Sequence, residues 1–190
     1  TEQFYTGCGK SMSEILMIIG GVVGAMFLLT VLVGAPYVPT HSRQFRRLLR
    51  HLRLNSQTDV LVDLGAGDGK IVRLSAPYVK LALGYEINPA LVALAKLRTR
   101  SFQNTRIKLA DFRQIQLPPE TTVIYIFSAG TFLNQVIALI NRHLQQANQS
   151  VTVISYGFEM PDLGQPEVYQ GFLIYRLKQK NTSKKPSSRV

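Results

Sequence analysis

The sequence predicts an α/β domain with a mostly parallel sheet and a C-terminal antiparallel hairpin, preceded by one transmembrane helix. Apolar segments suited to buried strands alternate with segments of helical spacing, and the last two strand segments are joined directly at Gln170-Gly171. A run without charged residues near the N-terminus predicts the membrane helix. We therefore expect an N-terminal tail (1–14), a transmembrane helix (15–35), one α/β domain (36–178) and a disordered basic tail (179–190).

The uncharged segment "ILMIIGGVVGAMFLLTVLVGA" runs from Ile15 to Ala35. At about 1.5 Å per residue, a helix of this length crosses a bilayer core of about 30 Å. A secretory signal peptide is the alternative, but its apolar region is usually shorter and follows a basic start. Met12 in "MSEILM" has the pattern of a natural start, so the sequence leaves open whether residues 1–11 belong to the native protein.

Basic residues follow the apolar segment closely. The arginines within this stretch, "HSRQFRRLLRHLRL", are Arg43, Arg46, Arg47, Arg50 and Arg53. Such an excess predicts that the domain lies on the cytoplasmic side of a membrane, or on the matrix side in an organelle. Apolar residues recur in the same stretch at helical spacing, which predicts an amphipathic helix with its apolar face on the domain. Its arginine face is either solvated or in contact with anionic lipid headgroups, and the sequence favours neither.

The formal net charge of +11 raises the question of a nucleic-acid partner. Much of the excess lies in the arginines after the apolar segment and in the tail "KQKNTSKKPSSRV", neither of which interleaves aromatic with basic residues. We therefore expect no nucleic-acid partner. The chain has a single cysteine, Cys8, and no Cys/His cluster with metal-ligand spacing, so we expect neither a disulfide nor a metal site.

The segment "VDLGAGDGKIV" joins the first predicted strand to a helical stretch at about 70–76. Its spacing matches neither the G-x-G-x-x-G dinucleotide fingerprint nor the P-loop. Asp63 ends the strand, and Gly65, Gly67 and Gly69 let the chain turn sharply while leaving no side chain where a ligand lies against the backbone. The pattern indicates a nucleotide-like ligand that need not carry phosphate.

The second strand, predicted at Leu81 to Tyr85, ends at Glu86. Asn88 and Pro89 then have the pattern of a helix N-cap and a first helical residue. An acid at this strand end, about 20 residues after the glycine loop, can accept hydrogen bonds from both ribose hydroxyls of a nucleoside. Glu86 is therefore the candidate ribose ligand.

The later elements continue the alternation. Strands are predicted at "TRIKLAD", "TTVIYIF" and "SVTVISYGF", a helix at "TFLNQVIALINRHLQQA" and the hairpin at "EVYQGFLIYRLK". Ligands of such sheets bind outside the carboxyl ends of the strands. Asp111-Phe112, Ser128 and the segment from Tyr156 to Phe158 follow these strand ends, so they are further candidates for the site.

The ordered segments "GAPYVPT", "VDLGAGDGKIV", "GYEINPALV" and "DF" resemble class I S-adenosylmethionine (SAM) methyltransferases, which have a Rossmann-like fold. Most closely, they are similar to the small membrane-anchored protein-lysine methyltransferases related to the ATP synthase c-subunit lysine methyltransferase. The resemblance covers about residues 36–158. It implies SAM as the cofactor.

The resemblance also implies roles for individual residues. Gly65, Gly67 and Gly69 face the methionine and ribose parts of SAM, while Asp63 orients the loop or meets the amino group, and Glu86 takes the ribose. Asp111 meets the adenine amino group with Phe112 beside the ring, although a helix cap is the alternative role for Asp111.

Two residues carry evenly weighed alternatives. Thr40, in a segment that closes over the cofactor in the resembled family, is either a SAM contact or part of a rigid link out of the membrane. Asp68 is either an exposed turn residue or a ligand contact.

Methyl transfer from a sulfonium is an in-line displacement that needs alignment and no metal. A lysine acceptor must arrive neutral, which burial in an apolar, aromatic-lined channel favours. Phe127, Ser128, Tyr156 and Phe158 are candidates to line such a channel, while aromatic residues in such positions, here Phe127, Tyr156 and Phe158, are more often core residues. The sequence assigns no catalytic base.

The fourth strand ends in "IYIFSAG" and lacks the Asn/Asp-Pro-Pro-Tyr/Phe pattern of enzymes that methylate planar nitrogens, which favours an aliphatic amine. The leading hypothesis is a SAM-dependent protein-lysine N-methyltransferase that acts on a membrane protein near the bilayer. The alternatives are a methyltransferase for a lipid or small molecule and a non-catalytic SAM-binding scaffold. A nucleic-acid methyltransferase comes last.

Overall fold

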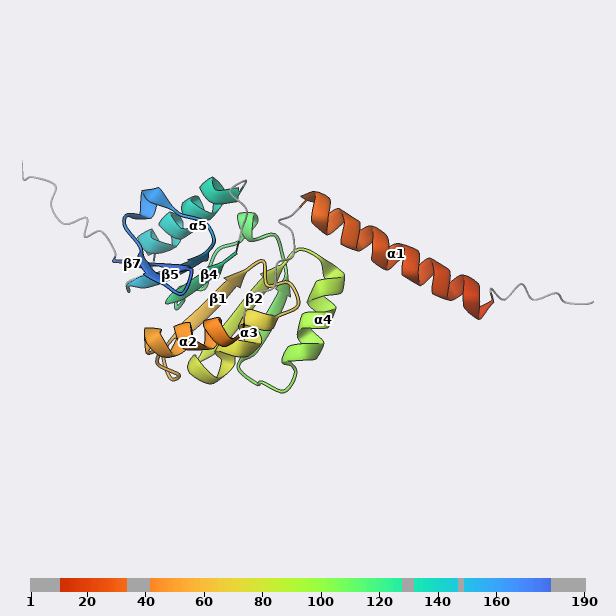
Figure 1. The fold of residues 1–190 in the computed structure, drawn as a ribbon, viewed down its shortest axis with the longest axis horizontal. Coiled ribbons are helices and arrows are strands. Elements are labelled where there is room, and N and C mark those ends of the chain that lie inside the picture. Colours follow the sequence, from red (N-terminus) through yellow and green to blue (C-terminus); the bar gives the residue numbers. More distant parts are fainter. Residues whose placement is uncertain (1–10, 34–41, 128–131, 147–148, 179–190) are drawn as a thin grey trace, which may run out of the picture. The chain divides into compact units, whose positions relative to one another are not determined.

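In the computed structural model of this chain, the described residues are 11–33, 42–127, 132–146 and 149–178, without the side chains of 23 and 26–33. The chain divides into two compact units, Thr1–Tyr37 and Val38–Val190. In the described residues, the first unit consists of one helix and the second of a sheet with helices on both faces (Figure 1).

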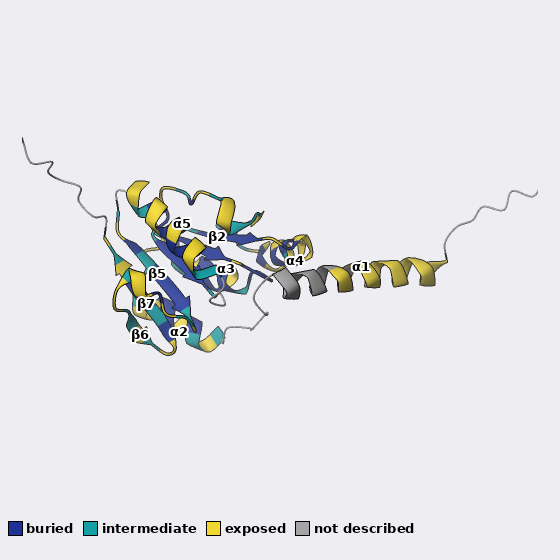
Figure 2. Ribbon diagram, turned by 90° about the horizontal axis from the view of Figure 1, so that it is seen from above, coloured by how far each residue is buried: buried dark blue, intermediate teal, exposed yellow. Residues whose placement is uncertain are grey.

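The helix of the first unit, α1, spans Met12–Val33. The large apolar side chains described in it are exposed (Figure 2): Met12, Ile15, Leu16, Met17, Ile18, Ile19 and Val22. Among the described residues, no helix combines the length and the apolar character needed to cross a membrane. The structure therefore confirms a helix over most of residues 15–35 but not its predicted transmembrane character.

The second unit is built on one seven-stranded sheet with the strand order β3-β2-β1-β4-β5-β7-β6. Its strands are β1 (Val60–Leu64), β2 (Leu81–Glu86), β3 (Thr105–Leu109), β4 (Val123–Ile126), β5 (Val151–Tyr156), β6 (Glu167–Tyr169) and β7 (Phe172–Leu177). The first five are parallel, and β7 runs antiparallel to both β5 and β6. This confirms the predicted mostly parallel sheet with a terminal hairpin. The strand order reverses at β1, where such sheets bind ligands.

Helices pack on both faces of the sheet (Figure 1). The helices α2 (Ser42–Leu52), α3 (Lys70–Ser75) and α4 (Pro89–Thr99) contribute to one apolar core, and α5 (Leu133–Gln146) contributes to the other. Successive residues of a strand point to opposite faces, so Leu61 belongs to the first core and Val62 to the second. Short 3-10 turns complete the fold: η1 (Ala76–Tyr78), η2 (Phe112–Gln114) and η4 (Pro161–Leu163).

The amphipathic helix predicted after the apolar segment is confirmed as α2. Its residues Phe45, Leu48 and Leu49 are fully buried. The Phe45 ring lies edge-on to Tyr125 of β4, with 5.3 Å between ring centroids, and 6.0 Å from the ring of Phe172 in β7. Helix α2 is therefore an integral part of the domain core.

Gly84 in the middle of β2 lies where no larger residue fits. A Cβ at this position would lie 2.6 Å from the Cβ of Ala66 and 2.9 Å from Cγ2 of Val72. Both neighbours are buried, in the loop after β1 and in α3. The missing side chain lets the loop and the helix rest directly on the strand.

We predict that Gly84→Ala lowers the free energy of unfolding by about 1–3 kcal/mol, because the added methyl overpacks a closely packed interior. Urea unfolding followed by circular dichroism measures the change. Gly21→Ala in α1 is the matched control, since a Cβ there would meet no atom within 4 Å. An unchanged midpoint for Gly84→Ala would contradict the packing described above.

Candidate functional site

The loop after β1 is held against the end of β2 by backbone hydrogen bonds. The N–H groups of Gly65 and Ala66 both donate to the carbonyl oxygen of Tyr85, each at 2.9 Å. Gly65 has φ 85°, and Gly69, at the start of α3, has φ 77°, a region that favours glycine. A Cβ on Gly69 would also lie 2.9 Å from the Cβ of Ala95 in α4. The glycines thus permit both the turn and the helix packing.

Glu86 connects this loop to the next one. Its buried carboxylate accepts one hydrogen bond from the N–H of Gly67 and one from the N–H of Asn88, each at 2.8 Å. A carboxylate can accept about four hydrogen bonds in all, so Glu86 keeps acceptor capacity for two hydroxyl groups. These two hydrogen bonds hold the Glu86 carboxylate at the strand end, where the sequence predicts that it accepts hydrogen bonds from a ribose.

Asn88 is the N-cap of α4, as the sequence predicts. Its Oδ1 accepts hydrogen bonds from the N–H groups of Ala90 at 2.8 Å and Leu91 at 3.3 Å, and Pro89 begins the helix. The cap fixes where α4 starts relative to Glu86.

Asp63 is buried at the end of β1, only 2% exposed, and its Oδ2 has no hydrogen-bond partner among the described residues. Burial raises the pKa of this carboxyl well above its ordinary value, and the negative charges of Glu86 and Asp68 raise it further. A cationic group close to Asp63 would relieve both costs. The three acids together favour a positively charged ligand.

Asp68 is buried, so its interpretation as an exposed turn residue is wrong. Its carboxylate pairs with the guanidinium of Arg98 in α4 and accepts a hydrogen bond from the N–H of Lys70 at 3.1 Å. The pairing ties the glycine loop to α4. In this structure Asp68 serves the architecture of the loop.

Asp111 lies at the carboxyl end of β3, beyond Glu86 in the sheet. It caps η2 by accepting a hydrogen bond from the N–H of Arg113, which confirms the cap that the sequence left open. The Arg113 side chain bonds both carboxylate oxygens and lowers the pKa of Asp111. The contact that the resemblance implies between Asp111 and the adenine amino group stays a prediction.

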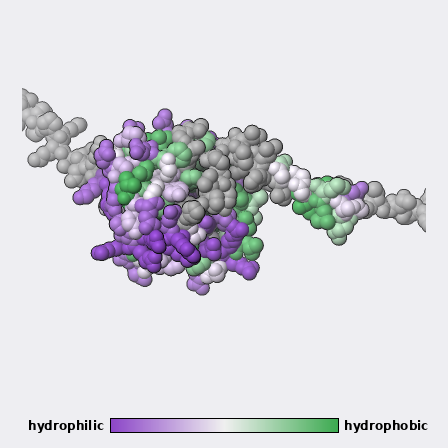
Figure 3. Space-filling model, viewed as in Figure 1, coloured by the Kyte–Doolittle hydropathy of each residue, from purple (hydrophilic) through white to green (hydrophobic). Residues whose placement is uncertain are grey.

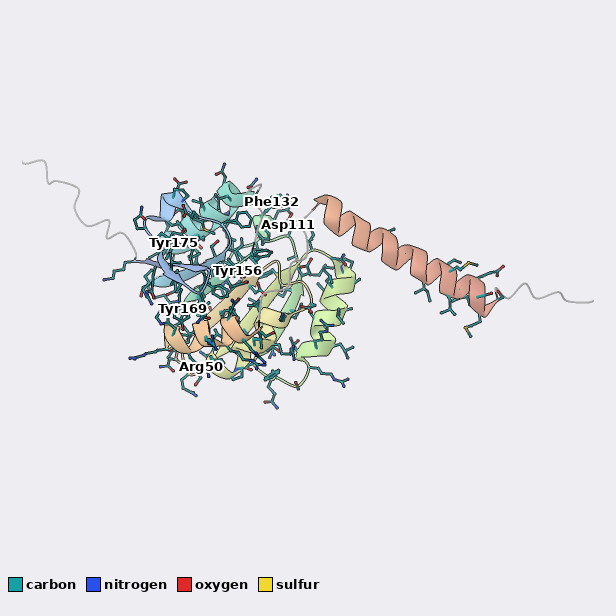
Figure 4. The ribbon with its side chains drawn as sticks, in the orientation of Figure 1. Arg50, Asp111, Phe132, Tyr156, Tyr169 and Tyr175 are labelled. Carbon is teal, nitrogen blue, oxygen red and sulfur yellow. The ribbon has the colours of Figure 1, made fainter. Side chains whose placement is uncertain are left out.

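Phe132 stands next to this strand end and was not predicted. Its ring lies edge-on to Phe112 with 6.5 Å between centroids, and the Arg113 guanidinium lies 5.2 Å from the ring centroid. Figure 4 places Phe132 close to Asp111 at one end of the sheet. Phe132 is far from η2 in the sequence, and no local pattern indicated that the two segments are in contact.

Two exposed apolar residues were also missed. Ile87, 49% exposed, directly follows the buried Glu86, and Leu109, 57% exposed, is paired with Glu86 in the β2–β3 register. Ligand sites combine apolar side chains with a few placed polar groups, so Ile87 and Leu109 are candidates to border a ligand held by Glu86. In the sequence, the apolar Ile87 directly follows Glu86, the acid that ends β2, and this was the signal that could have identified it.

The candidates for the substrate channel come together beyond β4 and β5. The Phe127 ring lies 5.6 Å from Tyr156 and 6.3 Å from Phe158, and all three side chains are partly exposed. Tyr156 also packs on Phe172, with 4.8 Å between centroids. The aromatic residues therefore share core packing with an accessible surface. Ser128 and Thr40, also predicted for the site, lie outside the described residues.

These residues fit the predicted cofactor SAM, which is a nucleoside with a cationic centre. The backbone at Gly65 is open, because a Cβ there would meet no atom within 4 Å. Glu86 offers acceptors for ribose hydroxyls, and Asp63 offers a buried carboxyl whose Oδ2 accepts no hydrogen bond from any described residue. In the part of the chain that the structure describes, no group of His, Cys, Asp and Glu side chains could hold a metal ion.

Comparison with known proteins identifies the family. No family model matches the sequence. The protein-lysine N-methyltransferase of Saccharolobus islandicus is 32% identical over 139 residues, which cover 70% of this chain and 83% of that protein. The chain belongs to this family of lysine methyltransferases. The ATP synthase c-subunit lysine N-methyltransferase of Xenopus laevis is 30% identical over 156 residues, which cover 76% of this chain and 66% of that protein.

Solved structures show the same fold. An RNA methyltransferase from Salinibacter ruber, in complex with S-adenosyl-L-homocysteine, has a TM-score of 0.62 and 24% identity, and the match covers 79% of this chain and 97% of that one. This likeness shows the fold alone. The lysine methyltransferase relatives confirm the predicted family and enzyme class.

We predict that Asp63→Asn stabilises the cofactor-free domain at pH 7 by about 1–3 kcal/mol and weakens SAM binding about tenfold to a hundredfold. The pKa of Asp63 is higher in the folded state than in the unfolded state. Its contribution to stability is therefore fully present below the unfolded pKa and is lost as pH rises through the folded pKa. Above the unfolded pKa, burial of this carboxyl therefore lowers the stability of the folded domain, and the amide removes that cost. Thermal unfolding with and without SAM measures both effects.

Asp162→Asn is the matched control, because Asp162 is exposed and lies in η4. It should change neither quantity. A less stable Asp63→Asn variant with unchanged SAM affinity would show that Asp63 has a structural role and not a role in the site.

Proposed function

We propose that this chain is a SAM-dependent methyltransferase that transfers methyl groups to the ε-amine of a lysine in a membrane protein. The observation that carries the proposal is its match to protein-lysine N-methyltransferases over most of the folded domain. The names of two kinds of relative give the ATP synthase c-subunit and the adenine nucleotide translocase as substrates, and both are membrane proteins. The mouse translocase enzyme is 48% identical over 64 residues, which cover 33% of this chain and 27% of that protein.

SAM supplies an electrophilic methyl on a sulfonium when bound, so the protein must hold and align two partners. Glu86 accepts the ribose hydroxyls while its own position is fixed by the N–H groups of Gly67 and Asn88. Asp63 places negative charge near the cationic end, and Asp111 and Phe112 border the base. These roles are supported by the positions of the residues at the carboxyl ends of adjacent strands.

The acceptor lysine reaches the site from the side of β4 and β5 in this proposal. Aromatic rings of Phe127, Tyr156 and Phe158 offer an apolar wall that lowers the pKa of an amine by desolvation. The lone pair of a neutral amine would form a bond to the methyl carbon of SAM as the carbon–sulfur bond breaks, so that S-adenosylhomocysteine would leave as a neutral thioether. The methylated ammonium product would then release a proton to solvent. No residue is needed as a strong base if the channel delivers the neutral amine.

The location at a membrane is part of the proposal. We propose that residues 15–35 form a single-pass anchor and that the domain lies on the cytoplasmic or matrix side. Support comes from the uncharged sequence, the exposed apolar side chains of the described part of α1 and the arginines that follow. An anchor confines enzyme and substrate to one surface and raises their effective concentration.

We predict that the full chain transfers radiolabelled methyl from SAM to a discrete, protease-sensitive band in membranes of its host. Amino-acid analysis of the band should recover the label as methyllysine. Glu86→Ala should abolish the transfer, because it frees the glycine loop and removes the ribose acceptor. Label that is extractable into organic solvent would assign the activity to lipid, and SAM binding without any label would favour a non-catalytic scaffold.

A second variant distinguishes residues that bind the acceptor from residues that bind SAM. Tyr156→Ala should lower the rate of methyl transfer while leaving the affinity for SAM unchanged, because Tyr156 lies at the end of β5, on the opposite side of β1 from β2 and Glu86. A parallel loss of SAM affinity would show that Tyr156 belongs to the cofactor site or to the core.

A further inference from the structure

Helix α2 presents a continuous arginine face that the proposed chemistry does not use. Its inner side is buried in the domain core through Phe45, Leu48 and Leu49. The side chains on its outer side and just beyond its end are exposed: Arg43, Arg46, Arg47, Arg50 and Arg53. Figure 3 shows a strongly hydrophilic surface in the region of α2, and Figure 4 shows Arg50 at its rim. We call these five residues the arginine face.

The charge of the arginine face is not neutralised within the described structure. The helix "SRQFRRLLRHL" contains no acidic residue. The ion pairs formed among described residues use other cations, namely Arg176 with Glu167, Arg98 with Asp68 and Arg113 with Asp111, and Glu167 also contacts the His51 ring of α2. Five guanidinium groups are therefore exposed with no described carboxylate within 4.0 Å, and their like charges repel one another and attract anions.

Few residues of sequence join α2 to the proposed anchor. Eight residues separate Val33, the last residue of α1, from Ser42, the first of α2. Even fully extended, they span at most about 32 Å. If residues 15–35 are embedded in a membrane, as proposed above, the arginine face follows the anchor closely along the sequence.

The chemistry of the face favours anionic lipid over nucleic acid. Within α2, Phe45 is fully buried and cannot stack on a base, and the ring of His51 is already stacked on Tyr169 with 4.1 Å between ring centroids. Guanidinium groups form paired hydrogen bonds with phosphate oxygens, and each basic residue near an anionic bilayer surface favours binding. A flat row of arginines suits a surface with many phosphates.

We propose that the arginine face binds the anionic headgroups of the membrane that holds α1, an inference that rests on the proposed membrane location. Binding through one side of α2 orients the domain, because α2 is fixed to the sheet by its buried face. The active site then keeps a constant angle to the bilayer and to any lysine presented near its surface.

The test uses the full chain in lipid nanodiscs of phosphatidylcholine alone or with about one third phosphatidylglycerol. In a Cys8→Ser background, a fluorophore is attached through Ser56→Cys, shortly after α2. A second protein carries it through Gln145→Cys in α5, on the other face of the sheet. Quenching by lipids with a nitroxide headgroup reports how near each fluorophore lies to the surface.

We expect quenching at residue 56 to be about twofold or more stronger in the anionic discs, and to fall to the neutral level in about 0.5 M salt. The control at residue 145 should not respond to lipid charge. Substitution Arg46→Gln/Arg47→Gln/Arg50→Gln should remove the difference, since it keeps helix propensity and removes charge. The matched variant Lys96→Gln/Arg100→Gln/Arg142→Gln, exposed cations in and next to α4 and α5, should retain it.

Equal quenching in the two kinds of disc, or no effect of the three α2 substitutions, would overturn this inference and leave the methyl-transfer proposal standing. Failure of the full chain to enter either disc would overturn the membrane location and this inference with it. A short RNA that binds through the same three arginines and removes the headgroup contact would assign the face to nucleic acid instead.

Discussion

The carboxylate of Glu86 is the interaction on which the arrangement of the site depends. It receives the N–H of Gly67 from the loop after β1 and the N–H of Asn88 from the start of α4, so one side chain joins the two loops that border the ligand position. The same loop donates two backbone hydrogen bonds to Tyr85, the residue before Glu86. A buried carboxylate held in this way needs no rearrangement before it receives a ligand, which favours binding by preorganisation.

The site combines Glu86, whose carboxylate accepts two backbone hydrogen bonds, with a second buried acid, Asp63. Asp63 lies in the neighbouring strand with a raised pKa and a carboxylate oxygen without a partner among the described residues. A buried carboxyl without a partner lowers the stability of the free domain and favours the binding of a cation. Functional sites often combine a cost in stability with a gain in binding in this way. Helix α2 shows a comparable division, because its apolar side supports the core while its arginine face remains exposed.

Local signals made much of this fold predictable from the sequence. Strand ends were marked by an acid or a glycine, as at Glu86, and Asn88-Pro89 fixed the start of α4 because a cap and a first-turn proline act within a few residues. Contacts between distant segments carried no such signal. The pairing of Asp68 with Arg98 crosses 30 residues, and the approach of Phe132 to Phe112 depends on how α5 packs on the sheet. Asp68 was therefore left open and Phe132 was missed.

The most direct test of the central claim is a calorimetric titration of SAM into the wild-type chain and the Glu86→Gln variant. The account predicts one SAM site per chain, and affinity about tenfold to a hundredfold weaker in the variant, because an amide offers one acceptor oxygen where the carboxylate offers two. Binding of equal strength in both proteins, or no binding to the wild type, would contradict it.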